Sequence, residues 1–206
     1  MRYNSTTVIL SILIFIQPQY FLPIKVKNRT DVSQIQQTEI GEFGLPRKAR
    51  KNVPAHLHTG IDIKRPSKNY INEPIYPIAD GRVISKRTDG PYAEIIIEHN
   101  CRGIKFWSLY EHIAGISVNM NELVKTTIPL ARFMNKSELD KYGWQFDHVH
   151  LEILKIKPQE INPDKLHPER FFKAYSLICY TKDDLNKYYY NPRNFLNALI
   201  NNSKIN

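Results

Sequence analysis

The stretch EPIYPIADGRVISKRTDGPYAEIIIEHNCRGIKFWSLYEH, residues 73–112, decides the fold. Turn signals punctuate it at Asp80-Gly81, at Asp89-Gly90 and within residues 100–103, at intervals of about ten residues. The segments between these turns are rich in β-branched and aromatic residues, which favour strands. They comprise residues 82–86, 93–98 and 104–110. This spacing predicts short antiparallel strands and therefore a mainly β domain.

A second motif, HVHLEI at residues 148–153, alternates polar and apolar positions. In an extended strand, side chains two positions apart point to the same face. His148, His150 and Glu152 then share one face, and the apolar residues between them face the core. The pattern is typical both of a half-exposed strand and of a metal or catalytic site, so both alternatives stay open.

The upstream motif HLHTGIDIK, residues 56–64, places His58 and Asp62 four positions apart. Gly60 and its β-branched neighbours disfavour a helix, so we expect a loop leading into a strand at residues 61–63. We expect Gly60 to let the backbone turn so that His58 approaches Asp62. Imidazole and carboxylate are both zinc ligands, and a catalytic zinc commonly takes three protein ligands. His58 and Asp62 supply two, and one histidine of HVH supplies the third.

Together, HTGID at residues 58–62, YEH at 110–112 and HVHLEI resemble the three motifs of the LytM/lysostaphin-type zinc metallopeptidases, the M23 family. The order ADGRVI, hairpin, IIIEH, turn and FWSLYEH is similar to that family's sheet, and the resemblance spans residues 46–165. It implies an antiparallel β-sheet or sandwich of the LytM type. We expect an irregular N-terminal linker before it and a short helical C-terminal tail after it.

The resemblance also implies a site and a reaction. His58, Asp62 and His150 would bind one Zn²⁺, while His112 and His148 would be catalytic residues beside it. The implied reaction is hydrolysis of peptide bonds in bacterial peptidoglycan, in stem peptides or cross-bridges, by a zinc-bound water. Two alternatives stay open. His148 could also bind the ion and close a structural site, or the chain could be a non-catalytic envelope-binding or hydrolase-activating domain.

The composition constrains the partners. The chain has 29 basic and 20 acidic residues, which give a formal net charge of +9. This charge favours polyanions, including anionic polymers of a cell envelope. The sequence contains no nucleic-acid-binding motif, so we expect no nucleic-acid partner. One basic cluster comprises Arg47, Lys48, Arg50 and Lys51, and we interpret most of the positive charge as a solvated surface.

The N-terminus predicts export. The apolar run VILSILIFI, residues 8–16, follows a cationic start, as in a signal peptide. A membrane anchor and a buried N-terminal strand are the alternatives, and any membrane contact is expected only through this segment. We expect a periplasmic, envelope or extracellular location. The predicted organisation is a signal peptide or anchor at 1–20, a linker at 21–45, the peptidase domain at 46–172 and a tail at 173–206, with a helix at 194–201.

Five other residues carry expectations. His99, at the end of IIIEH, is predicted to be a packed or capping residue. Cys101 and Cys179 either pair or remain separate buried thiols, and both alternatives stay open. Trp144 and Phe146, in the segment GWQFD before HVH, are expected to narrow or reshape a substrate cleft. The sequence does not determine the oligomeric state.

Overall fold

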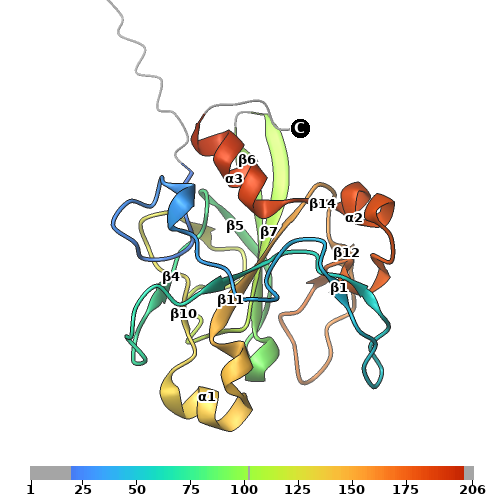
Figure 1. Ribbon diagram of the computed structural model, residues 1–206, viewed down its shortest axis with the longest axis horizontal. Coiled ribbons are helices and arrows are strands. Elements are labelled where there is room, and N and C mark those ends of the chain that lie inside the picture. Colours follow the sequence, from blue (N-terminus) through green and yellow to red (C-terminus); the bar gives the residue numbers. More distant parts are fainter. Residues whose placement is uncertain (1–19, 102, 202–206) are drawn as a thin grey trace, which may run out of the picture.

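The computed structural model describes residues 20–101 and 103–201 (Figure 1). Its central element is a seven-stranded antiparallel sheet in which six strands follow the order β14-β11-β7-β6-β5-β9 and β3 pairs with β11. The strands of this sheet are β3 (Ile61–Lys64), β5 (Gly81–Arg87), β6 (Glu94–Cys101), β7 (Ile104–Glu111), β9 (Leu123–Val124), β11 (His148–Leu154) and β14 (Tyr189–Tyr190). The predicted mainly β fold, and the predicted strands of residues 73–112, are confirmed.

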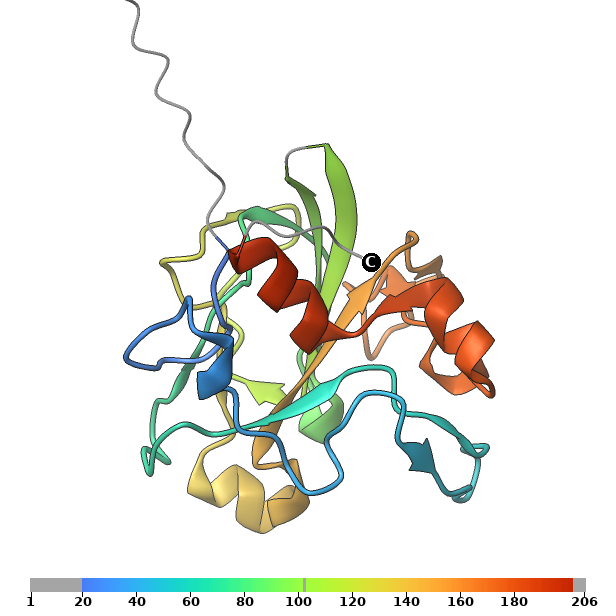
Figure 2. The ribbon, with the colours of Figure 1, turned by 45° about the horizontal axis from the view of Figure 1, so that its top comes forward.

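Smaller sheets and short helices surround the main sheet (Figure 2). The smaller sheets are formed by β4 (Pro74–Ile75), β10 (Ala131–Phe133) and β8 (Ile113–Ala114), by β1 (Pro46–Arg47) and β2 (His56–Leu57), and by β12 (Gln159–Glu160) and β13 (Phe172–Lys173). The helices are α1 (Lys136–Tyr142), α2 (Lys182–Tyr188) and α3 (Pro192–Ile200). Four 3₁₀ turns are η1 (Val32–Gln34), η2 (Gly90–Tyr92), η3 (Trp144–Phe146) and η4 (Ser176–Ile178).

The apolar positions of the central strands form the core. Val149, Leu151 and Ile153 of β11 are fully buried, as the alternation in HVHLEI predicts. Their polar neighbours in β11 are buried as well, so the strand is covered on both faces rather than half-exposed. Helix α3 packs against β11 and closes one end of the core (Figure 2).

The segments on either side of the predicted peptidase domain are packed against it. Leu22, Ile24 and Ile35 are buried in the main core, although residues 20–45 have no strand beyond isolated bridges. At the other end, β14 pairs with β11 and adds a strand to the sheet. The predicted domain boundaries stay a prediction. Residues 1–19, which carry the predicted signal, lie outside the described residues, and no helix within the described ranges is long and apolar enough to cross a membrane.

The two cysteines are free thiols. Cys101 is buried in the main core, whereas Cys179 is buried in a second cluster with Trp107 and Tyr189 on the other face of the sheet. The alternative of separate buried thiols therefore holds.

His99 is a buried hydrogen-bonding residue of β6, as expected. It is fully buried and stacks on Phe106, with ring centroids 4.6 Å apart. Its Nδ1 donates to the carbonyl of Asp80 at 2.9 Å, and its Nε2 lies 2.7 Å from the hydroxyl of Ser108. Burial lowers the pKa of His99 from 6.5 to about 4. The ring therefore joins β6 to β7 and to the turn before β5 as a neutral imidazole.

This burial predicts a pH-dependent stability. Between pH 6.5 and about 4 the unfolded chain protonates His99 and the folded chain does not, so stability falls by on the order of 3 kcal/mol as the pH falls through this window. In His99→Gln that part of the pH dependence should be absent, whereas His56→Gln, a variant of a less buried histidine, should retain it. Urea unfolding at several pH values measures the difference, and an equal pH dependence in all three proteins would contradict the assignment.

Candidate metal centre

The pairing of β3 with β11 brings two distant motifs together. Asp62 and His150 are direct partners across this antiparallel pair, so their side chains leave neighbouring backbone positions. His58 reaches the same point from the loop that leads into β3.

Gly60 allows this loop to lie directly against β11, because a Cβ at position 60 would lie 2.3 Å from the carbonyl oxygen of Leu151. Its φ is not positive. The backbone does bend at Gly60, as expected, and His58 approaches Asp62; the bend uses an ordinary φ, so the glycine is required for space rather than for a left-handed conformation.

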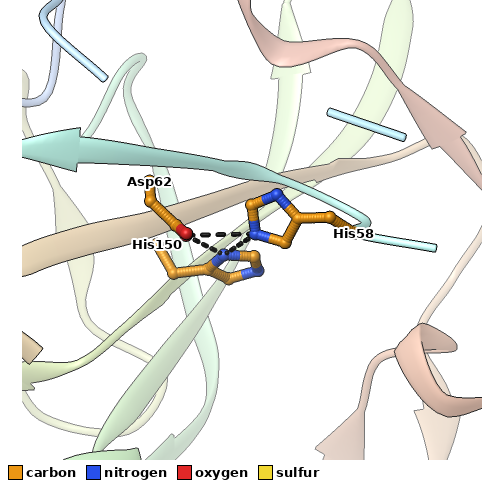
Figure 3. A group of neighbouring side chains, drawn as sticks. All are labelled: His58, Asp62 and His150. Carbon is orange, nitrogen blue, oxygen red and sulfur yellow. Dashed lines mark hydrogen bonds and ion pairs between the residues drawn. The ribbon is translucent and has the colours of Figure 1, made fainter. Parts of the chain in front are cut away.

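Three electron-pair donors converge at this point (Figure 3). His58 Nε2 lies 3.1 Å from Asp62 Oδ1 and 3.0 Å from His150 Nδ1, and His150 Nδ1 lies 2.8 Å from Asp62 Oδ1. All three residues are buried. Donor atoms of a tetrahedral zinc, each at roughly 2.0–2.1 Å from the ion, are about 3.3 Å apart. The triangle therefore has nearly the size that a zinc ion requires.

The outer hydrogen bonds fix the tautomers of both histidines. His58 Nδ1 faces the carbonyl of Glu42 at 2.9 Å, and His150 Nε2 faces the carboxylate of Glu152 at 3.2 Å. Carbonyl and carboxylate oxygens only accept, so each of these ring nitrogens carries the proton. In the neutral rings the inward nitrogens are then bare lone pairs, and Asp62 Oδ1 is a third acceptor. While both rings are neutral, three hydrogen-bond acceptors face one another with no proton between them, so the site requires a positive charge, either a proton on His150 or a metal ion.

The electrostatics lead to the same conclusion. Burial by itself would raise the pKa of Asp62, but hydrogen bonds with His150 and His58 outweigh it and hold the pKa well below its usual range. Burial would lower the pKa of His150, yet Asp62 and Glu152 raise it to about 10. The site therefore attracts positive charge strongly. A single proton on His150 satisfies only one edge of the triangle, whereas a metal ion satisfies all three donors.

Glu152 holds the imidazole of His150 from behind. Its Oε1 accepts from His150, from the hydroxyl of Thr59 and from the hydroxyl of Ser176 at 2.9 Å. The side chain is almost completely buried, and its Oε2 has no hydrogen-bond partner among the described residues. A buried carboxylate behind a ligating histidine orients the ring and increases its basicity. The alternation in HVHLEI already places Glu152 on the same strand face as His148 and His150, whereas nothing in the sequence indicated the hydrogen bond from Ser176.

His112 and His148 lie beside the triangle without joining it. Their ring centroids are 4.9 Å apart, and His148 Nε2 is 3.5 Å from Asp62 Oδ1. His112 has φ 62° and lies at the corner between β7 and β8, a left-handed conformation that is uncommon outside glycine. Its Nδ1 donates to the carbonyl of Pro91 at 2.6 Å, which leaves Nε2 as an acceptor.

Both of these histidines are held neutral. Burial, helped by the neighbouring His148 and His150, lowers the pKa of His112 to about 3. Burial also lowers the pKa of His148, to about 4. At neutral pH each ring therefore has an unprotonated nitrogen beside the triangle and can accept a proton.

Aromatic side chains line the histidine side of the site. Phe146 packs against His112, with ring centroids 4.9 Å apart, and Tyr92 lies 5.7 Å from Phe146 and 5.8 Å from His112. Trp144 is about half exposed and donates to Asp140 at 2.9 Å. The expectation that Phe146 and Trp144 shape a cleft stays a prediction, but Phe146 does contact a predicted catalytic residue. Tyr92 was not anticipated, because nothing in the local sequence links it to HVH.

The chemistry of the donor set fits zinc. Two imidazole nitrogens and one carboxylate oxygen are ligands that zinc prefers, and three protein ligands leave a position for water. Within the described ranges, no other group of three histidine, cysteine or acidic side chains is close enough to hold a metal ion. The structure thus brings together the three residues predicted as ligands and places the two predicted catalytic histidines next to them. Their roles remain proposals.

Comparisons with known proteins agree with this arrangement. The profile of "Peptidase family M23" matches residues 24–163. Lysostaphin, described as an antimicrobial peptidase from Staphylococcus simulans, has a TM-score of 0.50 and 14% identity, over 89% of this chain and 56% of lysostaphin. This likeness shows the fold. A zinc-containing peptidase from Vibrio cholerae is 26% identical, with a TM-score of 0.44 over 66% of this chain and 37% of its own.

A chain of the SpoIIIAH–SpoIIQ complex is 19% identical, with a TM-score of 0.45 over 66% of this chain and 92% of its own. No curated protein sequence gives a significant match. The family profile covers more than half of the chain, and the predicted motifs HTGID, YEH and HVHLEI lie within it. On this evidence, together with the matching fold, the chain belongs to peptidase family M23.

Proposed function

We propose that this chain is an exported zinc metalloendopeptidase that hydrolyses peptide bonds in bacterial peptidoglycan, in stem peptides or cross-bridges. His58, Asp62 and His150 would hold one zinc ion, and His112 and His148 would be the catalytic residues. The observation that carries the proposal is the buried triangle of three acceptors, with two neutral histidines beside it. Family membership supports the substrate class.

The organisation around the site completes the proposal. Residues 46–172 would be the peptidase domain and residues 1–20 an export signal or anchor, which places the enzyme in the periplasm, in the cell envelope or outside the cell. The net charge of +9 supports association with anionic envelope polymers. Nucleic acid is not a partner in this proposal.

When bound, zinc would make water nucleophilic near neutral pH and polarise the scissile carbonyl. His112 accepts a proton at Nε2, because its Nδ1 is committed to the carbonyl of Pro91. Once protonated, His112 can give the proton to the leaving amine, so the same ring would act first as base and then as acid. His148 Nε2, close to Asp62, would help to position the attacking water beside the scissile carbonyl.

Peptidoglycan digestion tests the activity. The purified chain should release new amino termini from peptidoglycan, detected by mass spectrometry, and a chelator should stop the release until zinc is added back. His58→Ala and Asp62→Ala should bind no zinc, because each removes one of three ligands. Chelator-insensitive binding to peptidoglycan without new termini would contradict the enzyme proposal and favour an envelope-binding domain.

His112→Ala separates catalysis from metal binding. The variant should retain one zinc per chain, since His112 is outside the donor triangle, and should lose roughly 10²–10⁴-fold in kcat. Metal analysis together with kinetics on a peptidoglycan peptide measures both quantities. Full activity in this variant would exclude the assigned role. Lys105→Ala, on the exposed part of β7, serves as the control and should change neither quantity.

Glu152→Gln and Ser176→Ala test the support behind His150. Glu152→Gln removes the negative charge that holds the imidazole, so zinc affinity should fall about 10–100-fold. Ser176→Ala removes one of the two hydroxyls on the same oxygen and should cause a smaller loss. Competition with a chromogenic chelator gives the affinities. Glu160→Gln, an exposed control, should match the wild type, and unchanged affinity in Glu152→Gln would refute the role of this carboxylate.

A further inference from the structure

The two oxygens of Asp62 have different partners. Oδ1 points into the donor triangle and contacts both ligand histidines. Oδ2 accepts from Nη2 of Arg47 at 3.0 Å. Each oxygen of the carboxylate therefore has its own partner: Oδ1 contacts the two histidines of the triangle, and Oδ2 accepts from the guanidinium.

The guanidinium limits how Asp62 can bind a metal ion. A carboxylate that binds through both oxygens must turn both lone-pair sets towards the ion. Arg47 holds Oδ2 away from the triangle by a charge-assisted hydrogen bond. An arginine in a protein does not lose its charge, so this hydrogen bond persists. A carboxylate held in this way offers one ligand atom and occupies one coordination position.

Without this role, a positively charged side chain so close to a cation site would be electrostatically unfavourable. A positive side chain next to a cation site repels the ion. This repulsion is offset only because Asp62 lies between the two positive charges. The other members of the basic cluster, Lys48, Arg50 and Lys51, are exposed. Arg47 alone of the four is turned to the site, with its side chain only 20% exposed.

The backbone around Arg47 is fixed to the ligand loop. Leu45 accepts from the amide of His58 at 2.9 Å, and Gly44 donates to the carbonyl of His58 at 2.8 Å. Glu42 accepts from the His58 ring, and Gly41 accepts from the amide of Asp62 at 3.0 Å. The segment 41–47 therefore holds the backbones of both ligand residues, and the Arg47 guanidinium is placed by the same scaffold.

We propose that Arg47 is a positioning residue that keeps Asp62 a one-oxygen ligand and thereby keeps a coordination position of the bound metal free. This inference rests on the proposed metal site. It assigns the basic hairpin between β1 and β2 a part in the geometry of the centre, where the sequence predicted only a charged surface.

Cobalt(II) substitution provides the test, because visible absorption by cobalt falls in intensity as its coordination number rises from four to five. Arg47→Ala frees Oδ2, so the cobalt form should show weaker visible bands than the wild type. X-ray absorption of the zinc form should show one additional oxygen neighbour. The kcat for a peptidoglycan peptide should fall about 10–100-fold while one metal ion per chain is retained. Arg50→Ala, in the same hairpin, is the matched control and should match the wild type in all three measurements.

Arg47→Gln provides a second variant in case removal of the whole side chain disturbs the hairpin, and Arg47→Lys should restore the wild-type spectrum because it returns a charged donor. A wild-type spectrum in folded Arg47→Ala or Arg47→Gln would overturn the proposal. That outcome is distinct from a failure of the proposed function, in which the wild-type chain itself would bind no metal or cleave no peptidoglycan.

Discussion

The convergence of three acceptors in a buried space is the constraint on which the rest of this structure depends. Asp62, His58 and His150 bring lone pairs to within 3.1 Å of one another, and their outer hydrogen bonds prevent both rings from turning their protons inward while neutral. Unpaired acceptors in a protein interior are costly. A cation would remove that cost, so the same arrangement would favour binding of the proposed zinc ion.

The sheet makes this convergence possible. Asp62 and His150 face each other because β3 pairs with β11 in one register. If the pairing shifted by one residue, the two side chains would lie on opposite faces of the sheet. The core fixes that register, since the apolar residues of β11 are fully buried on the other face. The geometry of the candidate metal site and the hydrophobic packing are therefore specified by the same strand alternation.

The surroundings of the triangle come from segments that lie far apart in the chain. Residues 41–47 support His58 and Asp62, η2 supplies the carbonyl that orients His112, and η4 supplies Ser176 behind His150. Ser176 lies beyond the residues that match the family profile. The left-handed backbone of His112 is tolerated because this surrounding structure holds the ring on several sides.

The sequence by itself determined the fold class and pointed to His58, Asp62 and the HVH motif as candidate ligands, and the resemblance to the M23 family singled out His150 within that motif. Turn residues and β-branched runs over residues 73–112 are local signals, and the histidine and aspartate motifs carry their chemistry in their spacing. Helices α1 and α2 were not predicted, although each begins with a capping box, Asn135 with Glu138 and Thr181 with Asp184, which is a local signal of a helix N-terminus.

Only the tertiary structure decided the rest: the packing of residues 20–45 into the core, the close approach that requires Gly60, and the contacts of Arg47, Ser176 and Pro91. These depend on which segments meet across the fold. A hydrogen bond between residues far apart in the chain leaves no periodicity, turn or spacing in the sequence of either partner.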